Sequence, residues 1–317
     1  TMLSGPAASV AGALMHLRVS DGIYFEVGGT STNIGVIRNG RPTVKYARVG
    51  GHETYVSSLD VRVTGIAGGS MVRIRDGKLV DVGPRSAHIA GLPYSAFAEP
   101  SAFVGAQVEL FRPKSGDPDD YVSIRVADGT RYAITNTCAA NVLGYAKPGL
   151  HAYGNPESAR RAMAPLAAML GCSVEDAARQ ILERATAKAI PVVEQLIAEY
   201  GLDRGQVVLV GEGGGVAALL PLTAERMQLS HTISKDAEVI SSIGVALALV
   251  REVIERVIPN PQPEDLKAIK REAIDAVVRL GAAAENVEVT IEVNPHSQRV
   301  RAIAMGASEM RARRRSS

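Results

Sequence analysis

The sequence predicts an α/β protein whose first half is mostly strand and whose second half is mostly helix. Alternating β-branched residues separated by short turn sequences fill the first half, and long amphipathic segments fill the second. Two apolar strands each run directly into a glycine-rich turn, near residues 28 and 211. The chain has 317 residues, of which 46% are hydrophobic, so it can bury a large core.

The first half begins with a helix rich in small residues, expected over residues 4–17. β-branched and aromatic residues then predict three strands, over residues 23–27, 33–38 and 43–49. Asn39-Gly40 has the composition of a tight turn between the second and third strands. Two further hairpins are expected at Asp76-Gly77 and Asp128-Gly129.

The helices of the second half are bounded by local end signals. One helix is expected over residues 156–170 and should end at Gly171, and the next should begin at the N-cap Ser173 and end at Gly201. An apolar strand over residues 207–210 precedes the second glycine turn, where another helix should begin. The remaining elements are helices over residues 236–258 and 264–280 and a strand pair over residues 287–293 and 299–304.

Composition and charge argue against several classes of function. The net charge is +2 and the charged residues are mixed in sign, so we expect no nucleic-acid partner. No apolar run approaches the ~20 residues that a membrane helix needs, so we expect no membrane partner. Residues 311–317 are expected to form a disordered basic tail. Cys138 and Cys172 share no motif spacing, which is typical of free thiols in a cytoplasmic protein.

The first glycine turn, Gly28-Gly29-Thr30-Ser31-Thr32, has the composition of a phosphate-binding site. It combines consecutive backbone N–H groups with three hydroxyls, and glycine permits an anion to approach closely. Glu26, just before the turn, would hold a Mg²⁺-bound water or orient a nucleophilic water. The same turn would also suit a purely structural hairpin.

The second turn, Gly211-Glu212-Gly213-Gly214-Gly215, connects a strand to a helix. Such a turn presents free N–H groups and the positive end of a helix dipole to a ligand. Its glycines would leave room for a base or a ribose, although they would also serve tight packing between the strand and the helix.

Together, the two turns resemble the second phosphate loop and the adenosine loop of the actin-like ATPase superfamily. Two helical segments with small residues on one face, 6–13 and 237–250, resemble the helices that cross at the interdomain hinge of that fold. We therefore expect the second half of a ribonuclease-H-like, actin-type ATPase fold, with a helical subdomain. This domain should cover residues 1–258, and a small C-terminal α/β extension should cover residues 259–310.

At these residues the chain resembles the hydantoinase A/oxoprolinase family, and the resemblance covers about residues 3 to 255. The matching segments are Ser4 to Ala8, Glu26 to Asn33, Leu59 to Val72, Val82 to Ala87 and Leu209 to Gly215. The resemblance implies ATP-dependent opening of a cyclic amide, with ATP and Mg²⁺ as cofactors. ATP would phosphorylate the amide oxygen, and water would then attack the activated carbon.

The resemblance also implies roles for individual residues. Glu26 and Asn33 would be catalytic, and Glu26 would hold Mg²⁺ through water. The phosphates would be bound by Gly28, Gly29, Thr30, Ser31 and Thr32. The nucleoside would be flanked by Gly211, Gly213, Gly214 and Gly215. The substrate cleft would be lined by Gly68, Gly69 and Ser70.

The chain departs from the family pattern at two of these positions and at Glu212. Glu26 and Asn33 stand where the family usually has aspartates, and Glu212 stands where a glycine is usual. The longer Glu26 side chain shifts the carboxylate, and Asn33 lacks a charge. These departures leave open a second hypothesis, a non-catalytic assembly or reactivation subunit with a decayed ATPase.

The resemblance also implies a partner. In the family, a domain with the first phosphate loop precedes the Ser-Gly-Pro helix, whereas this sequence begins at Thr1. We therefore expect a second chain and a hetero-oligomer, with a shortened form or a cut precursor as alternatives. Thr1 would itself combine a hydroxyl nucleophile with an α-amine base, as in autoprocessed N-terminal nucleophile hydrolases. Removal of an initiator methionine would also leave a threonine at this end.

Overall fold

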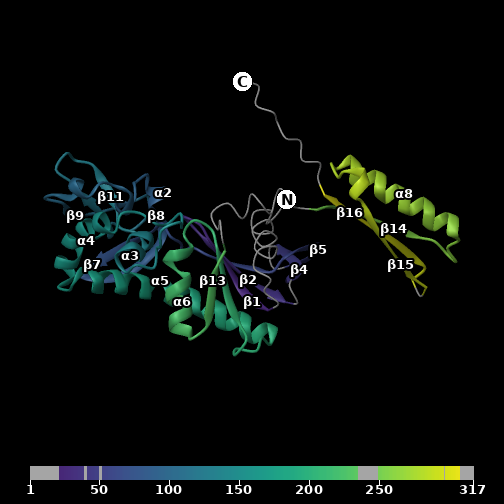
Figure 1. Ribbon diagram of the computed structural model, residues 1–317, viewed down its shortest axis with the longest axis horizontal. Helices are drawn as coiled ribbons and strands as arrows, with labels where there is room; N and C mark the ends of the chain where they lie inside the picture. The colour runs from purple at the N-terminus through teal and green to yellow at the C-terminus, as the bar shows by residue number, and fades with distance from the viewer. Residues whose placement is uncertain (1–20, 39–40, 50–51, 235–248, 296, 308–317) are drawn as a thin grey trace, which may run out of the picture. The chain divides into compact units, whose positions relative to one another are not determined.

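The computed structural model describes residues 21–38, 41–49, 52–234, 249–295 and 297–307 (Figure 1). The chain divides into two compact units, Thr1–Ser241 and Ser242–Ser317. Several predicted features lie outside the described residues: Thr1, the helix over residues 4–17, the Asn39-Gly40 turn, residues 235–248 of the helix expected over 236–258, and the tail over 311–317.

A six-stranded sheet organises the first unit. Its strands are β1 (Gly22–Val27), β2 (Thr32–Arg38), β3 (Arg41–Pro42), β6 (Val61–Thr64), β12 (Val208–Glu212) and β13 (Ser230–Ile233). Their order is β13-β12-β1-β2-β3, and β6 also pairs with β2. β1 runs parallel to β12 and antiparallel to β2, and β12 runs parallel to β13. The strands predicted over residues 23–27, 33–38 and 207–210 are therefore confirmed.

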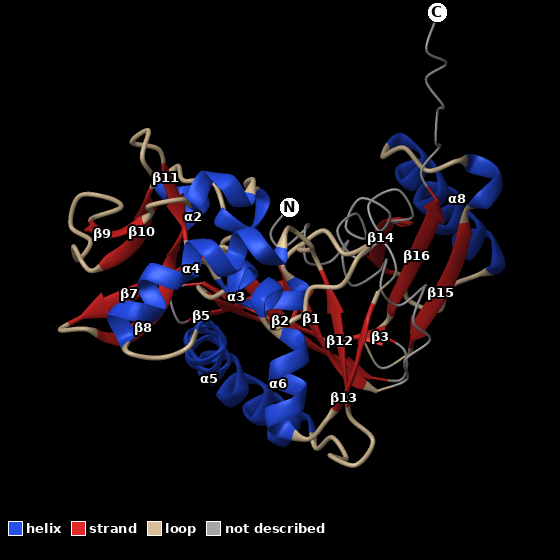
Figure 2. Cartoon of the chain, turned by 60° about the vertical axis from the view of Figure 1, so that its left-hand side comes forward, coloured by secondary structure: helices blue, strands red, loops and turns tan. Residues whose placement is uncertain are grey.

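The first unit also contains short and long helices. The α-helices are α2 (Ala87–Ala90), α3 (Asn136–Val142), α4 (Pro156–Leu170), α5 (Val174–Tyr200) and α6 (Leu220–Met227). The 3₁₀ helices are η1 (Ser95–Phe97), η2 (Pro100–Phe103) and η3 (Val216–Ala218). α5 contacts β2, and α6 contacts β12 and β13. Figure 2 shows both helices on one side of the six-stranded sheet.

The two long helices end where the sequence predicts. α4 ends at Gly171, with a φ of 66°, and α5 ends at Gly201, with a φ of 56°. At the start of α5, the Ser173 hydroxyl accepts a hydrogen bond of 3.0 Å from the backbone N–H of Asp176. Local capping and left-handed glycines therefore define both helices, as expected from residue type.

Replacing Ser173 with alanine should remove this cap and destabilise the first unit by about 1 kcal/mol, because a backbone N–H at the helix start loses its acceptor. Chemical denaturation followed by circular dichroism would measure the loss. Ser115, an exposed loop residue, supplies the control variant Ser115→Ala. Equal stability of both variants would contradict the capping role.

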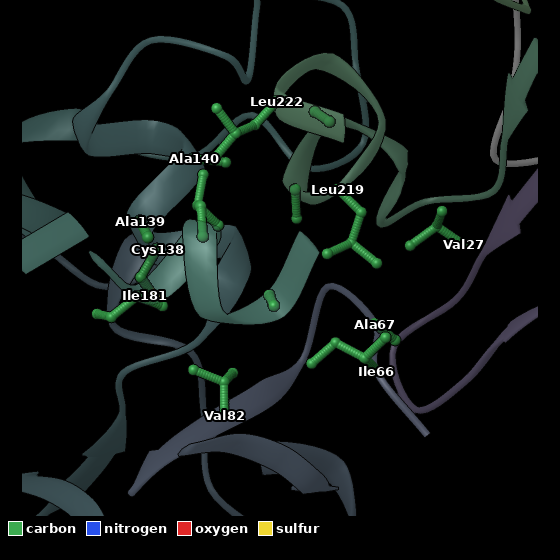
Figure 3. Close-up of a cluster of buried hydrophobic side chains, with 14 of the residues drawn as sticks. Val27, Ile66, Ala67, Val82, Cys138, Ala139, Ala140, Ile181, Leu219 and Leu222 are labelled. Carbon is green, nitrogen blue, oxygen red and sulfur yellow. The ribbon is translucent and has the colours of Figure 1, made fainter. Parts of the chain in front are cut away.

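Side chains of β1 alternate between two faces of the sheet. Ile23, Phe25 and Val27 lie in the main buried cluster, to which α3, α5 and α6 also contribute (Figure 3). Tyr24 packs on the other face with Ile37 and Val210. Because successive side chains of a strand point to opposite faces, Glu26 lies on the same face as Tyr24.

A second, five-stranded sheet follows in the chain. It contains β7 (Ser70–Arg75), β8 (Lys78–Ser86), β9 (Gln107–Phe111), β10 (Tyr121–Arg125) and β11 (Arg131–Ala133). The predicted turn Asp76-Gly77 connects β7 to β8, and its residues have φ values of 50° and 66°. The segment with Asp128-Gly129 connects the antiparallel strands β10 and β11. Both predicted hairpins are confirmed.

The strand expected over residues 43–49 is confirmed, but it does not pair within the six-stranded sheet. Residues Arg41–Pro42 form β3, which stays in the six-stranded sheet beside β2. Val44–Val49 form β4, which pairs with β5 (His52–Leu59) in a separate two-stranded sheet. The chain leaves one sheet and enters another at this point, and hydrophobic alternation contains no signal for such a change of partner.

The second unit contains β14 (Leu249–Val257), α8 (Pro263–Arg279), η4 (Ala284–Asn286), β15 (Glu288–Asn294) and β16 (Arg299–Ala307). Its sheet has the order β14-β16-β15. The last predicted helix and the closing strand pair are confirmed, since they correspond to α8, β15 and β16. The hydrophobic cluster of this unit forms between α8 and one face of the sheet.

The helix predicted over residues 236–258 was wrong where the structure describes it. Residues Leu249–Val257 form β14, which pairs with β16 along its whole length. Val250, Ile254 and Ile258 pack in the cluster of the second unit. A spacing of four suits one face of a strand as well as one stripe of a helix, so the pairing with β16 decided the outcome. The second unit therefore includes residues before 259.

Candidate functional site

Three loops meet where the parallel strands β1 and β12 end. They are residues 28–31 after β1, residues 213–215 after β12, and residues 65–69 between β6 and β7. The Gly215 N–H donates to the Val27 carbonyl at 2.8 Å. The N–H groups of Gly68 and Gly69 donate to the carbonyls of Gly28 and Gly29, both at 3.1 Å. The structure thus brings together the two predicted glycine turns and the predicted cleft loop.

The missing side chains of three glycines make this close approach possible. A Cβ on Gly215 would lie 2.5 Å from the Gly28 carbonyl oxygen, and one on Gly213 would lie 2.4 Å from the Val27 carbonyl oxygen. A Cβ on Gly68 would lie 2.9 Å from the Gly215 Cα. Each contact is with backbone, which cannot move aside easily. These glycines therefore allow the loops to pack, whatever else they bind.

Gly211 was expected to flank the nucleoside, and a helix was expected to begin at this turn, but the structure differs on both points. Gly211 lies inside β12, where a Cβ would meet side-chain atoms of Val216 and Leu220 at 2.4 Å. It therefore serves packing between the strand and the following segment. That segment begins with the 3₁₀ helix η3, and α6 starts only at Leu220.

The start of α3 supports the loop over residues 65–69, and sequence analysis missed it. The Asn136 amide donates to the Ala67 carbonyl at 2.8 Å. The Thr137 hydroxyl and backbone N–H both donate to the Gly68 carbonyl, at 3.0 and 2.8 Å. Both side chains are buried. No motif spacing in the sequence connects residues 136 and 137 to residue 68.

The hydroxyls predicted to bind phosphate or to line the cleft differ in their exposure to solvent. Gly29 and Thr30 are exposed, and the Thr30 hydroxyl lies 3.1 Å from the Ser86 hydroxyl. Thr32 is fully buried, and its hydroxyl donates to the Ile66 carbonyl at 2.6 Å. Ser70, expected along a cleft, is also fully buried, and its hydroxyl accepts from the Ala67 N–H at 2.9 Å. Thr32 and Ser70 thus use their hydroxyls inside the fold.

Acidic side chains lie next to each other at the ends of β1 and β12. Glu26 is the register partner of Glu212 on β12 and of Asn33 on β2. The Asn33 amide donates to a Glu26 carboxylate oxygen at 2.7 Å. Glu212 is fully buried, and neither of its carboxylate oxygens has a hydrogen-bond partner among the described residues. Burial, and then the negative charge of Glu26, raise the pKa of Glu212 to about 8.

These donors fit Mg²⁺. The structure describes no group of three or more His, Cys, Asp or Glu side chains that would hold a metal ion. Mg²⁺ sites, however, usually use one or two carboxylates and retain several waters. Glu26 and Glu212 supply that number, and the buried carboxylate of Glu212 has no hydrogen-bond donor in the part of the chain that the structure describes. A cation at this position would supply the missing charge.

Two aromatic side chains contact the loops, and sequence analysis gave neither a role. A Cβ on Gly69 would lie 2.0 Å from the Tyr94 hydroxyl oxygen, and one on Gly29 would lie 3.4 Å from the same atom. Burial raises the pKa of Tyr94 to about 12, so its hydroxyl stays protonated at neutral pH. His151, which is exposed, packs against Gly214. Tyr94 thus faces the first turn and His151 the second.

Comparison with known proteins gives a family and two similar structures. The model of the hydantoinase/oxoprolinase family matches residues 1–254. Acetone carboxylase in its nucleotide-free form is 17% identical, with a TM-score of 0.64, over 98% of this chain and 50% of that chain. The ATP-dependent caprolactamase from Pseudomonas jessenii is 19% identical, with a TM-score of 0.55, over 96% of this chain and 49% of that chain. The comparison with curated proteins finds no match.

The structural similarity extends over nearly the whole chain, so the predicted α/β, actin-type ATPase fold is confirmed. The chain spans about half the length of the two compared proteins. Within the part of the chain that the structure describes, no helix is both long and apolar enough to cross a membrane.

Proposed function

This chain belongs to the hydantoinase/oxoprolinase family, and we propose that it is the ATP-binding part of an enzyme that opens a cyclic amide. The observation that carries the proposal is the junction of the two glycine turns at the ends of parallel strands, where open α/β sheets bind their ligands. One of the compared proteins is an ATP-dependent caprolactamase, which is consistent with a cyclic-amide substrate.

In this proposal the first turn binds the phosphates of ATP. The backbone of Gly28 and Gly29 and the hydroxyls of Thr30 and Ser31 would contact the phosphate oxygens, since Gly29 and Thr30 are exposed. Gly213 and Gly214 would flank the nucleoside, with His151 beside them. Mg²⁺, when bound near Glu26, would neutralise phosphate charge during transfer to the amide oxygen.

Glu26 is the proposed catalytic carboxylate. The hydrogen bond from Asn33 orients its side chain, and the carboxylate would position the water that attacks the activated carbon. Gly68 and Gly69 belong to the loop beside the first turn, and the Tyr94 hydroxyl lies next to Gly69. The cyclic amide substrate would therefore approach the phosphates from the side of Tyr94. Substrate specificity would then depend on the segments around η1.

The proposal includes a partner. A second chain with the first phosphate loop would complete the nucleotide site, and the working unit would be a cytoplasmic hetero-oligomer. The chain spans about half the length of the compared proteins, which is consistent with a nucleotide site completed by a further part. The two cysteines are free, as expected for a reducing compartment.

The test is ATP hydrolysis by the chain together with such a second chain, in the presence of hydantoins, lactams or oxoproline. The Glu26→Gln variant should lower turnover by a factor on the order of 10² while retaining ATP binding, because the carboxylate that orients the attacking water is lost. Binding would be measured by equilibrium dialysis with labelled ATP. ATP binding without turnover in the wild-type pair would instead favour the non-catalytic assembly subunit, and no ATP binding would refute the proposal.

Tyr94 supplies an independent prediction. Its hydroxyl has no hydrogen-bond partner among the described residues, so Tyr94→Phe should leave the stability of the fold almost unchanged. If the hydroxyl donates to a phosphate or amide oxygen in the transition state, kcat should fall on the order of 10²-fold. Tyr153→Phe, at an exposed tyrosine, is the matched control. Unchanged kcat in Tyr94→Phe would show that the hydroxyl only packs against the first turn and the loop over residues 65–69.

A further inference from the structure

We infer that Glu26 and Glu212 together bind one divalent cation of the Mg²⁺ type, with the Ser234 hydroxyl as a further oxygen donor. Glu212 is the residue that distinguishes this chain, since the resemblance described above places a glycine there. The inference deepens the proposed function, because it assigns the cation to two direct carboxylate ligands of this chain.

The register of four strands places the donors in one row. Glu26 pairs with Glu212 across β1 and β12, and Asn33 pairs with Glu26 from β2. The Ser234 N–H donates to the Gly211 carbonyl at 2.9 Å, which extends the pairing of β12 and β13 by one residue. Ser234 therefore lies beside Glu212. Neighbouring strands are about 4.8 Å apart, so the two carboxylates can share one ion.

Unpartnered polar groups on the same face are a second observation. Both Glu212 carboxylate oxygens and the Ser234 hydroxyl lack hydrogen-bond partners among the described residues, and both side chains are at most 1% exposed. The Tyr24 hydroxyl, two residues before Glu26 on the same face, is also buried and has no hydrogen-bond partner within the described ranges. Leaving such groups unsatisfied is costly. A bound cation with its waters would satisfy the Glu212 carboxylate and the Ser234 hydroxyl together.

The chemistry of the donors selects the class of cation. The row contains carboxylate, amide and hydroxyl oxygens and no histidine or cysteine, which suits Mg²⁺ or Mn²⁺ and not a structural zinc ion. The first glycine turn begins two residues after Glu26. A cation held here would therefore lie next to the loop proposed to bind phosphates.

Mn²⁺ binding to the purified full chain tests the inference, with electron paramagnetic resonance detecting the free ion. The wild-type chain should bind one Mn²⁺, and Mg²⁺ should displace it. Glu212→Gln and Glu26→Gln should each weaken binding at least about tenfold, because each removes one of two anionic ligands. Glu285→Gln, which removes an exposed carboxylate in the second unit, should bind as the wild type does. Absence of Mn²⁺ binding to the wild type, or equal binding by Glu212→Gln, would overturn the inference.

Thermal unfolding supplies a readout that does not depend on activity. Mn²⁺ should raise the Tm of the wild type, and the increase should disappear in Glu212→Gln. In EDTA, Glu212→Gln should have a Tm equal to or above that of the wild type, because a neutral amide replaces an unpartnered buried carboxylate. A Tm increase of the same size in Glu212→Gln would contradict the assignment. The experiments need neither ATP nor a second chain, so their failure is distinguishable from failure of the proposed ATP-dependent reaction.

Discussion

Replacing Gly213 with alanine should destabilise the first unit by about 3 kcal/mol, because two unfavourable effects combine at this position. Gly213 has a φ of +87°, which alanine adopts only with strain. Its new Cβ would also lie 2.4 Å from the carbonyl oxygen of Val27 and 2.9 Å from the carbonyl carbon. Val27 is held in β1, so the turn after β12 would have to move away from the turn after β1. ATP binding should therefore be lost together with stability.

Gly116→Ala separates the two effects. Gly116 has a nearly identical φ of +86°, but a Cβ there would have nothing within 4 Å. We expect this variant to lose only about 1 kcal/mol, from backbone strain alone. Urea denaturation of both variants, followed by circular dichroism, gives the comparison. If the two variants lose the same stability, the loop junction is deformable and the clash has no consequence.

Replacing Asp120 with asparagine should cost about 2 kcal/mol, because it removes the negative charge shared by two arginines. The Asp120 side chain is only 7% exposed. It accepts hydrogen bonds from the Arg73 Nε at 2.8 Å, the Arg73 Nη2 at 3.0 Å and the Arg75 Nη2 at 2.8 Å. These contacts connect β7 to the start of β10. Asp119→Asn is the matched control, since the neighbouring Asp119 side chain is 82% exposed.

The Asp120 carboxylate should also make the stability of the first unit depend on pH. Burial would raise the pKa of Asp120, but hydrogen bonds and positive charge from Arg73 and Arg75 outweigh it, so the pKa is lowered. Because the pKa is lower in the folded state, ionised Asp120 stabilises the fold. This stabilisation is complete above the ordinary pKa of about 4, and it is lost as the pH falls through the lowered pKa of the folded state. Urea midpoints measured between about pH 2 and pH 7 should therefore fall less steeply on acidification in Asp120→Asn than in the wild type. Parallel curves would show that Asp120 is not responsible.

Helix ends and turns were predicted correctly from the sequence where they depend on interactions between residues close together in the chain. The Ser173 cap and the left-handed glycines at 171 and 201 act within one turn of the chain, and they define α4 and α5 correctly. The turn at Asp76-Gly77 is equally local. The two glycine turns were recognisable because each combines an apolar strand with consecutive glycines, and their order along the chain indicated the family that the comparison confirmed.

Some features depend on which distant segments of the chain become neighbours, and only the tertiary structure determined these. Residues 249–257 have a spacing that suits either a helix or a strand, and pairing with β16 makes them β14. Thr32 and Ser70 carry hydroxyls and were predicted to face a ligand. In the structure, the Thr32 hydroxyl donates to a backbone carbonyl and the Ser70 hydroxyl accepts from a backbone N–H. Glu26 and Glu212 are far apart in the sequence and become register partners only because β1 lies parallel to β12. Strand register follows from packing of the whole sheet, so no local pattern contains it.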